Sequence, residues 1–227
     1  MIEKTFAMAT SASLSAALCR ANQGILRQKM GLLKALSFRL GKDQAQTAFA
    51  QPCPLAGGAT MGQHLRHSMD HMERATVAAA TTDKQNTPAM IHYDTRTRGG
   101  ADEQDMDAAQ ARIERVQAML AQVVAEQESS SSSDNLENKE VQACFMLSGD
   151  NTEEFKLPST AARELGFAAH HAIHHLAMVK IIALHTAKLP AEDLPADFGR
   201  APSTVNYDRN ATTTTRDDAG LPHQKAQ

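Results

Sequence analysis

The chain has 227 residues and a formal net charge of −3, with 42% hydrophobic and 22% charged residues. This length suits one domain of moderate size with tails, or two small ones, and the charge shows no footprint of nucleic-acid binding. Aromatic residues make up 4% of the chain and Trp is absent, so Ala, Leu and Met must fill the core, which favours packed helices.

The three cysteines, Cys19, Cys53 and Cys144, are odd in number and show no paired spacing. Such usage indicates reduced thiols in a reducing compartment, and we expect a cytoplasmic protein. No uninterrupted apolar run approaches 18 residues, so we expect no transmembrane span and no membrane partner.

Residues 11–41 are predicted to form the first helix. Leucines recur there at near-helical spacing, and Gly41 follows where a helix commonly ends. The segment is also rich in Ser and Arg and lacks acidic residues between Glu3 and Asp43. That composition is typical of a transit peptide, so import into mitochondria or another organelle is the alternative to a cytoplasmic location.

Two more helices are expected between residues 60 and 128. Residues 42–58 carry two prolines and two glycines and are predicted to be a loop. A second helix follows at 60–81, then a loop at 82–100 and a third helix at 101–128. The second helix carries three histidines: His64, His67 and His71.

The segment after the third helix is predicted to be less regular. Residues 129–135 are Ser-rich and are interpreted as a mobile linker inside a single domain that spans 1–208. Two short β-prone runs around Gly149 predict a small hairpin. Residues 209–227, with four consecutive threonines, are predicted to be a disordered C-terminal tail.

The fourth helix is predicted at 159–188, and its centre holds four histidines in six residues. At about 100° per residue, His171 and His175 lie about 40° apart and within the apolar stripe. His170 and His174 lie at the edge of that stripe. A single inward His is often a satisfied core residue, hydrogen-bonded to a carbonyl or carboxylate. Two of them one turn apart are harder to satisfy without a shared cation, because unpaired buried polar groups cost about 1–3 kcal/mol.

Four segments together resemble the DinB-like superfamily: GQHLRHSMDH (62–71), IHYDTRTRG (91–99), STAARELGFAAHHAIHHLAMV (159–179) and LPADFGRAPSTVNYD (194–208). The resemblance covers roughly residues 12–208. It implies an all-α fold, a four-helix bundle, to which this chain adds a small β-hairpin between the third and fourth helices. It also implies a divalent metal held by three histidines, which fall here on His67, His171 and His175.

The third ligand is where two arguments disagree. On a helical wheel, His64 and His71 lie nearer the centre of the inner face of the second helix than His67 does. We follow the resemblance and expect His67 to be the ligand. His64 or His71 remains the alternative third ligand; otherwise they would orient the ligands or face solvent at the helix edge.

The resemblance implies a metal-binding function, with zinc as the expected ion and nickel or iron as alternatives. One hypothesis is a metal-dependent enzyme that uses a metal-bound thiol or water, of the thiol-dependent transferase or hydrolase type. Its partners would be a small-molecule substrate and a low-molecular-weight thiol, with a homodimer as an open option. The other hypothesis is a non-catalytic metal-binding module with a sensor, stress-response or partner-binding role. Glu164 is either a base near the site or a hydrogen-bond acceptor that orients a ligand, or else a first-turn residue that suits the helix dipole.

Overall fold

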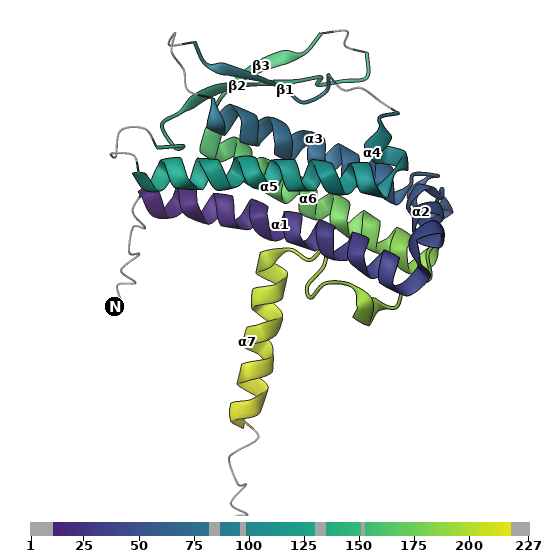
Figure 1. The fold of residues 1–227 in the computed structure, drawn as a ribbon. Helices are drawn as coiled ribbons and strands as arrows, with labels where there is room; N and C mark the ends of the chain where they lie inside the picture. The colour runs from purple at the N-terminus through teal and green to yellow at the C-terminus, as the bar shows by residue number, and fades with distance from the viewer. Residues whose placement is uncertain (1–10, 82–86, 96–98, 130–134, 151–152, 219–227) are drawn as a thin grey trace, which may run out of the picture.

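Four long helices pack side by side around one core in the computed structural model, which describes residues 11–81, 87–95, 99–129, 135–150 and 153–218 (Figure 1). They are α1 (Ser11–Leu40), α3 (Met61–Ala80), α5 (Met106–Ser129) and α6 (Ala161–His185). Both α1 and α3 pack against α5 and α6, so each of the four has two neighbours. Helices α1, α3 and α6 agree closely with the predicted ones. The helix predicted over 101–128 is interrupted at Asp105, whose backbone is extended, so α5 begins at Met106. The chain is mainly helical, as expected.

The core consists of aliphatic and small side chains, in keeping with the composition. Each long helix contributes fully buried residues to one continuous cluster, including Leu26, Leu36, Met72, Val116, Leu120, Ala172 and Ile182. Burying an aliphatic side chain of this size stabilises the fold by about 1.5–3 kcal/mol. The alanines of α6 keep that helix slim, which lets α3 approach it closely.

The N-terminus of α3 is fixed by a capping box. The Thr60 hydroxyl accepts from the Gln63 N–H at 3.0 Å, and the Gln63 side chain accepts from the Thr60 N–H at 3.1 Å. Gly62 follows in the first turn, where a Cβ atom would lie 2.0 Å from the Glu103 carbonyl oxygen. Only glycine allows this contact with the short helix α4 (Ala101–Gln104).

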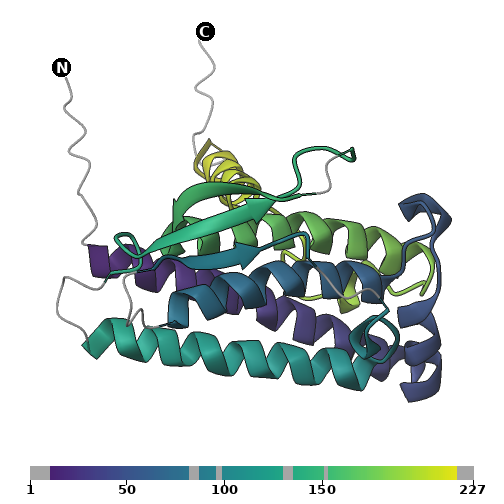
Figure 2. The same cartoon turned by 90° about the horizontal axis from the view of Figure 1, so that it is seen from above.

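A three-stranded sheet covers α3 and α6 on one side (Figure 2). Strands β2 (Glu140–Phe145) and β3 (Phe155–Thr160) are antiparallel and form the predicted hairpin. Strand β1 (Ala89–His92) pairs in parallel with β2, with His92 opposite Cys144. The prediction of a loop over 82–100 is therefore wrong at β1, because only a non-local partner makes this short segment a strand.

Residues 42–58 are only partly a loop. Helix α2 (Lys42–Ala50) begins directly after Gly41, whose φ of 75° turns the chain away from α1. Its buried residues Ala45, Ala48 and Phe49 have the spacing of one helical face. The prolines and glycines lie beyond α2, near the 3₁₀ turn η1 (Pro54–Ala56). A second such turn, η2 (Ala191–Asp193), follows α6.

Helix α7 (Pro202–Asp218) extends away from the four long helices (Figure 1). Pro202 stands at its first position, where proline is well tolerated. Ion pairs join Arg209 to Asp197 at 2.9 Å and Arg200 to Asp208. The prediction of a disordered tail over 209–227 is wrong for 209–218, which continue α7. Residues 219–227, and residues 130–134 of the predicted linker, lie outside the described residues.

Helix α6 has the length and composition of a candidate membrane span, with a mean hydropathy of 1.2 over its most apolar window. The absence of long apolar runs had led us to expect no such segment. In this structure 44% of that window is buried, and α6 packs against α1 and α3. The central helix of a packed core meets the same criteria of length and composition as a membrane span.

Candidate metal centre

Helices α3 and α6 face each other and bring their histidines together. The N-terminus of α6 is capped by Thr160, whose hydroxyl accepts from the Arg163 N–H at 3.2 Å. With both helix starts fixed by caps, His67 of α3 lies opposite His171 and His175, which are one turn apart on α6.

Three imidazoles converge through their Nε2 atoms. His171 Nε2 lies 3.1 Å from His67 Nε2 and 3.1 Å from His175 Nε2. One ring nitrogen of each of the three lies within 4.8 Å of the others. Nitrogens that share one zinc ion at bonds of about 2.0–2.1 Å lie no more than about 4 Å apart. The two 3.1 Å separations meet that condition, so this group is able to hold a metal ion.

His64 contacts His175, one of the three convergent histidines, on the side of its ring away from Nε2. Its Nδ1 lies 2.9 Å from Nδ1 of His175, while its own Nε2 is buried without a hydrogen-bond partner. A neutral His175 that offers its Nε2 lone pair carries its proton on Nδ1, and therefore donates to His64. His64 thus orients His175 and lies outside the group of three convergent nitrogens.

His71 is also buried, but it takes part in aromatic packing. Its ring stacks on Tyr93, with centroids 4.7 Å apart and planes 14° apart, and it lies 4.0 Å from the His171 ring centroid. The ring of Phe145 also stacks on the ring of Tyr93, with centroids 4.9 Å apart. Aromatic contacts therefore connect the sheet to the histidines, from Phe145 through Tyr93 and His71 to His171.

Burial keeps the inner histidines neutral. It lowers the pKa of His175 to about 2, and the neighbouring His171 lowers it further in the same direction. The pKa of His71 is likewise lowered to about 2 by burial, with His171 as the next cause. Burial also lowers the pKa of His64. Neutral imidazole is the form that binds metals, so the environment prepares these rings for a cation.

Glu164 does not contact the three convergent histidines through any hydrogen bond of the described residues. Its fully buried carboxylate accepts from Tyr93 at 2.7 Å, Ser159 at 2.6 Å and Arg163 at 2.6 Å. Burial, and next the Glu164 charge, raise the pKa of Tyr93, so the phenol stays protonated and donates. Glu164 lies in the first turn of α6, as the dipole interpretation expects, and its hydrogen bond with Tyr93 connects it to the stacked ring of His71.

A buried ion-pair network holds α3 in its register. Arg112 of α5 contacts Asp70 at 2.7 Å, Glu73 at 2.6 Å and Asp102 at 2.6 Å. Arg66 bridges Asp70 at 2.6 Å and Glu103 at 2.5 Å. Asp70 is thus shared by two guanidinium groups, which ties the His67 turn to α4 and α5.

The structure brings together all three histidines chosen from the sequence, His67, His171 and His175. His170 and His174, which the wheel places at the edge of the apolar stripe, are exposed. The helical wheel placed His64 and His71 near the centre of the buried face of α3. His71 is indeed buried. A wheel does not show, however, in which direction the ring nitrogens point. From the sequence, Tyr93 is expected either at the mouth of the site or in a loop tied across the bundle end, and its stacking on His71 is not predicted.

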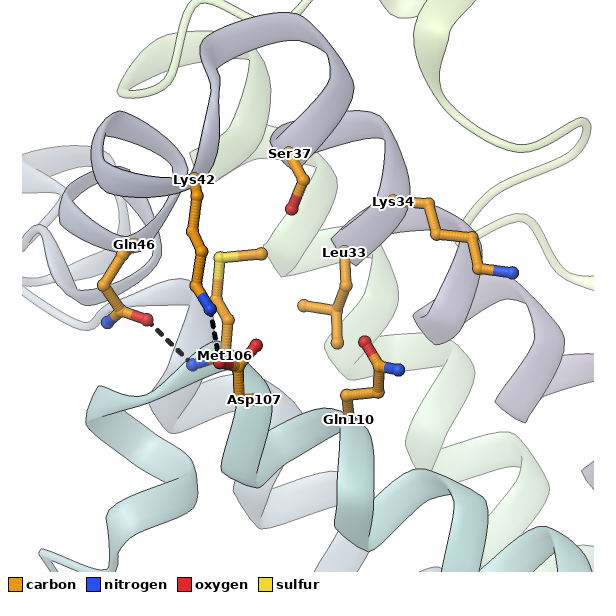
Figure 3. A pocket seen from close by; sticks show the side chains of 8 residues that line it. All are labelled: Leu33, Lys34, Ser37, Lys42, Gln46, Met106, Asp107 and Gln110. Carbon is orange, nitrogen blue, oxygen red and sulfur yellow. Dashed lines mark hydrogen bonds and ion pairs between the residues drawn. The ribbon is translucent and has the colours of Figure 1, made fainter.

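The pocket drawn in Figure 3 lies elsewhere, between α1, α2 and α5. It has a volume of about 330 Å³, and Lys42 and Asp107 form an ion pair across it at 2.8 Å. Histidines are absent from its lining, which is Leu33, Lys34, Ser37, Lys42, Gln46, Met106, Asp107 and Gln110. The group of three convergent histidines is therefore separate from this pocket.

Comparison with known proteins finds one significant similarity. FK506-binding protein 5 of Rhizopus delemar is 29% identical over 118 residues, which is 52% of this chain and 27% of that protein. The chain therefore spans about a quarter of the length of this relative. No protein-family model matches the chain, and no solved structure matches it.

Proposed function

We propose that this chain is a DinB-like metal-binding protein in which His67, His171 and His175 hold one divalent ion. The single observation that carries the proposal is the pair of 3.1 Å Nε2–Nε2 separations centred on His171. The packing of α1, α3, α5 and α6, each against two of the others, supports the four-helix bundle that the resemblance implies.

The residues fit a metal better than they fit a hydrogen-bonded cluster. His171 Nε2 faces two other ring nitrogens, and one imidazole nitrogen either donates one proton or offers one lone pair. The Nε2 atom of His171 therefore cannot form a normal hydrogen bond with both neighbouring nitrogens at once. A shared cation accepts all three lone pairs at once. Three neutral imidazoles suit zinc best, with nickel and iron as alternatives.

An enzyme is favoured over a closed structural site. Among the described residues, the group of converging donors contains three histidines and no fourth ligand, and His64 points its Nδ1 at His175 instead. Three protein ligands with an open position are typical of catalytic zinc. When bound, the ion would supply a Lewis acid that lowers the pKa of a thiol or a water molecule. His67 and His171 are half-buried, so the protein does not fully enclose that side of the group.

The chain's own residues would shape such a site in defined ways. His64 orients His175, and the rings of Tyr93 and Phe167 provide an apolar wall beside His71 and His171. The reaction class that this arrangement supports is thiol transfer or hydrolysis of a small molecule. The similarity to FK506-binding protein 5 adds no function here, since it covers only a small part of that protein.

The direct test is metal analysis of paired variants. We expect His171→Ala to abolish zinc at this site, and His170→Ala, on the exposed side of the same helix, to retain it. Equal loss in both variants would contradict the proposed ligand set. Addition of low-molecular-weight thiols to the zinc-loaded protein then separates the two hypotheses. Protection of the zinc from a chelator by one thiol would support the enzyme, whereas no effect of any thiol would favour the non-catalytic module.

A further inference from the structure

A second cluster of metal-binding side chains lies on the outer face of the sheet, away from the three histidines. It comprises His92 at the end of β1, Cys144 in β2 and Glu154 just before β3. One donor atom of each, a ring nitrogen, the sulfur and a carboxylate oxygen, lies within 4.8 Å of the other two. We propose that these three residues form a second site for a thiophilic divalent cation such as zinc.

Strand pairing creates the cluster. His92 is the direct partner of Cys144 on one side, and Lys156 of β3 is its direct partner on the other. Directly paired residues project from the same face of a sheet. Because side chains alternate along a strand, His92 faces outward while Tyr93, the next residue, faces the helices and stacks on His71. The two candidate sites therefore lie on opposite sides of the sheet: one on its outer face, the other between the helices that its inner face covers.

The carboxylate of Glu154 is already oriented for this role. Its Oε1 accepts from the Asp94 N–H at 3.3 Å and from the Thr95 hydroxyl at 3.4 Å. That leaves Oε2 directed at Nδ1 of His92, 2.5 Å away. Arg74 of α3 donates to the backbone carbonyls of His92, Tyr93 and Thr95, which anchors this end of β1. Such supporting contacts are typical of metal ligands.

The donor set selects the metal. Sulfur, imidazole nitrogen and carboxylate oxygen are all zinc ligands, whereas Mg²⁺ and Ca²⁺ take oxygen alone. The Cys144 side chain is fully buried, and burial together with Glu154 raises its pKa. Without a cation the thiol therefore keeps its proton. Binding would release that proton to solvent, leaving one thiolate and one carboxylate to balance the charge of a divalent ion.

Cobalt(II) tests the proposal, because at the sheet site it gives an absorption signal that the three-histidine site cannot produce. A thiolate bound to cobalt gives near-ultraviolet charge-transfer absorption, and imidazole ligands alone do not. We expect the full chain, reduced with a phosphine rather than a thiol, to develop this band and to saturate it by two cobalt ions per chain, because the three-histidine site also binds cobalt. The band should vanish in Cys144→Ser. Absence of the band in the folded wild-type protein, or its persistence in Cys144→Ser, would overturn the proposal.

Cys53 offers a matched control, because its sulfur lies 3.9 Å from Nδ1 of His185 and so forms another Cys–His pair. Cys53→Ser should keep the band. His92→Gln should keep the fold, since its side chain is 46% exposed, yet lose the band or weaken cobalt binding at least tenfold. Unchanged binding in His92→Gln would overturn the ligand set.

The two proposed metal sites can be tested independently of each other. His171→Ala should lose the metal of the three-histidine site but retain the thiolate band. Loss of the band in His171→Ala would mean that the sheet holds no separate site. Conversely, a band that appears while His171→Ala leaves total metal unchanged would contradict the proposed function and still support the site on the sheet.

Discussion

Single residues in this chain illustrate how far spacing alone identifies a site. His171 and His175 were predicted from the helical wheel because two buried imidazoles one turn apart share a face. The choice of His67 rested on the resemblance. The wheel reports which side of α3 is buried, but it does not report which ring nitrogen points where, and the 2.9 Å contact of His64 with His175 depends on that direction.

His64 also gives a prediction at this scale. Removal of its imidazole in His64→Ala leaves Nδ1 of His175 without its 2.9 Å partner but leaves the three convergent Nε2 atoms in place. We expect zinc affinity to fall about 10–100-fold, with stoichiometry retained when zinc is in excess. Competition with a chromophoric chelator measures the affinity. Complete loss of zinc would mean that His64 is itself a ligand.

Lys29, which is not one of the proposed metal ligands, gives a second residue-scale prediction. It is fully buried, donates to the Ser68 hydroxyl at 2.6 Å, and has a pKa lowered well below 10.5, mainly by burial and next by Arg112. The unfolded chain binds a proton on Lys29 below about pH 10.5, and the folded chain does not until its lowered pKa is reached. This group therefore destabilises the fold at neutral pH.

Lys29→Met should accordingly raise the free energy of unfolding at neutral pH, by about 1–4 kcal/mol. Ser68 keeps a partner in this variant, because its hydroxyl also donates to the Leu65 carbonyl at 2.9 Å. Urea denaturation measures the change. Lys34→Met is the matched control, since Lys34 is exposed on the same helix and its replacement should have little effect. Destabilisation by Lys29→Met would indicate that Lys29 is charged and paired with Asp70.

At the scale of elements, the helices were predictable and the sheet was only half predictable. Periodic leucines, caps and glycines are local signals, and they located α1, α3, α5 and α6 within a few residues. The β2–β3 hairpin is also local. Strand β1 depends on parallel pairing with β2, about fifty residues away. The cluster of His92, Cys144 and Glu154 depends on that same pairing, so no sequence window contained it.

Contact between α3 and α4 depends on Gly62, which gives an element-scale prediction. In Gly62→Ala the new Cβ would lie 2.0 Å from the Glu103 carbonyl oxygen and 2.7 Å from the Phe49 ring. Since the carbonyl is backbone, α4 must shift, and the protein should lose at least about 1–3 kcal/mol of stability. Gly149→Ala is the control, because a Cβ at Gly149 meets nothing within 4 Å. Equal stability of both variants would show that α4 moves without cost.

At the scale of the whole molecule, the core is built around groups that must remain uncharged. His71 and His175 are largely buried, and each has a pKa of about 2. Both take part in the contact between α3 and α6, which also meets the sheet through Tyr93. The stability of the fold, the geometry of the three convergent histidines and the position of the sheet are therefore linked through the same pair of helices.

This linkage predicts the pH dependence of the metal-free protein. In the unfolded chain, His71 and His175 titrate near their ordinary pKa of 6.5, whereas in the folded chain burial keeps both neutral down to about pH 2. Above about pH 6.5 neither state binds these protons, so their contribution to stability is constant. As the pH falls below 6.5 the unfolded chain binds protons that the folded chain does not. Each histidine then lowers the free energy of unfolding by up to about 1.4 kcal/mol per pH unit.

Urea denaturation of the metal-free protein between about pH 7.5 and pH 5 tests this expectation, because most carboxylates titrate below that range. Stability should be highest at the upper end and fall steadily towards pH 5. His71→Phe, which preserves the stacking on Tyr93, should reduce the slope, and His170→Gln, on the exposed face of α6, should not. Zinc at 100 times its dissociation constant should add about 2.7 kcal/mol at pH 7.5, and less as acid competes for the same nitrogens. A stability independent of pH across this range would mean that the histidines of the core take up protons in the folded state.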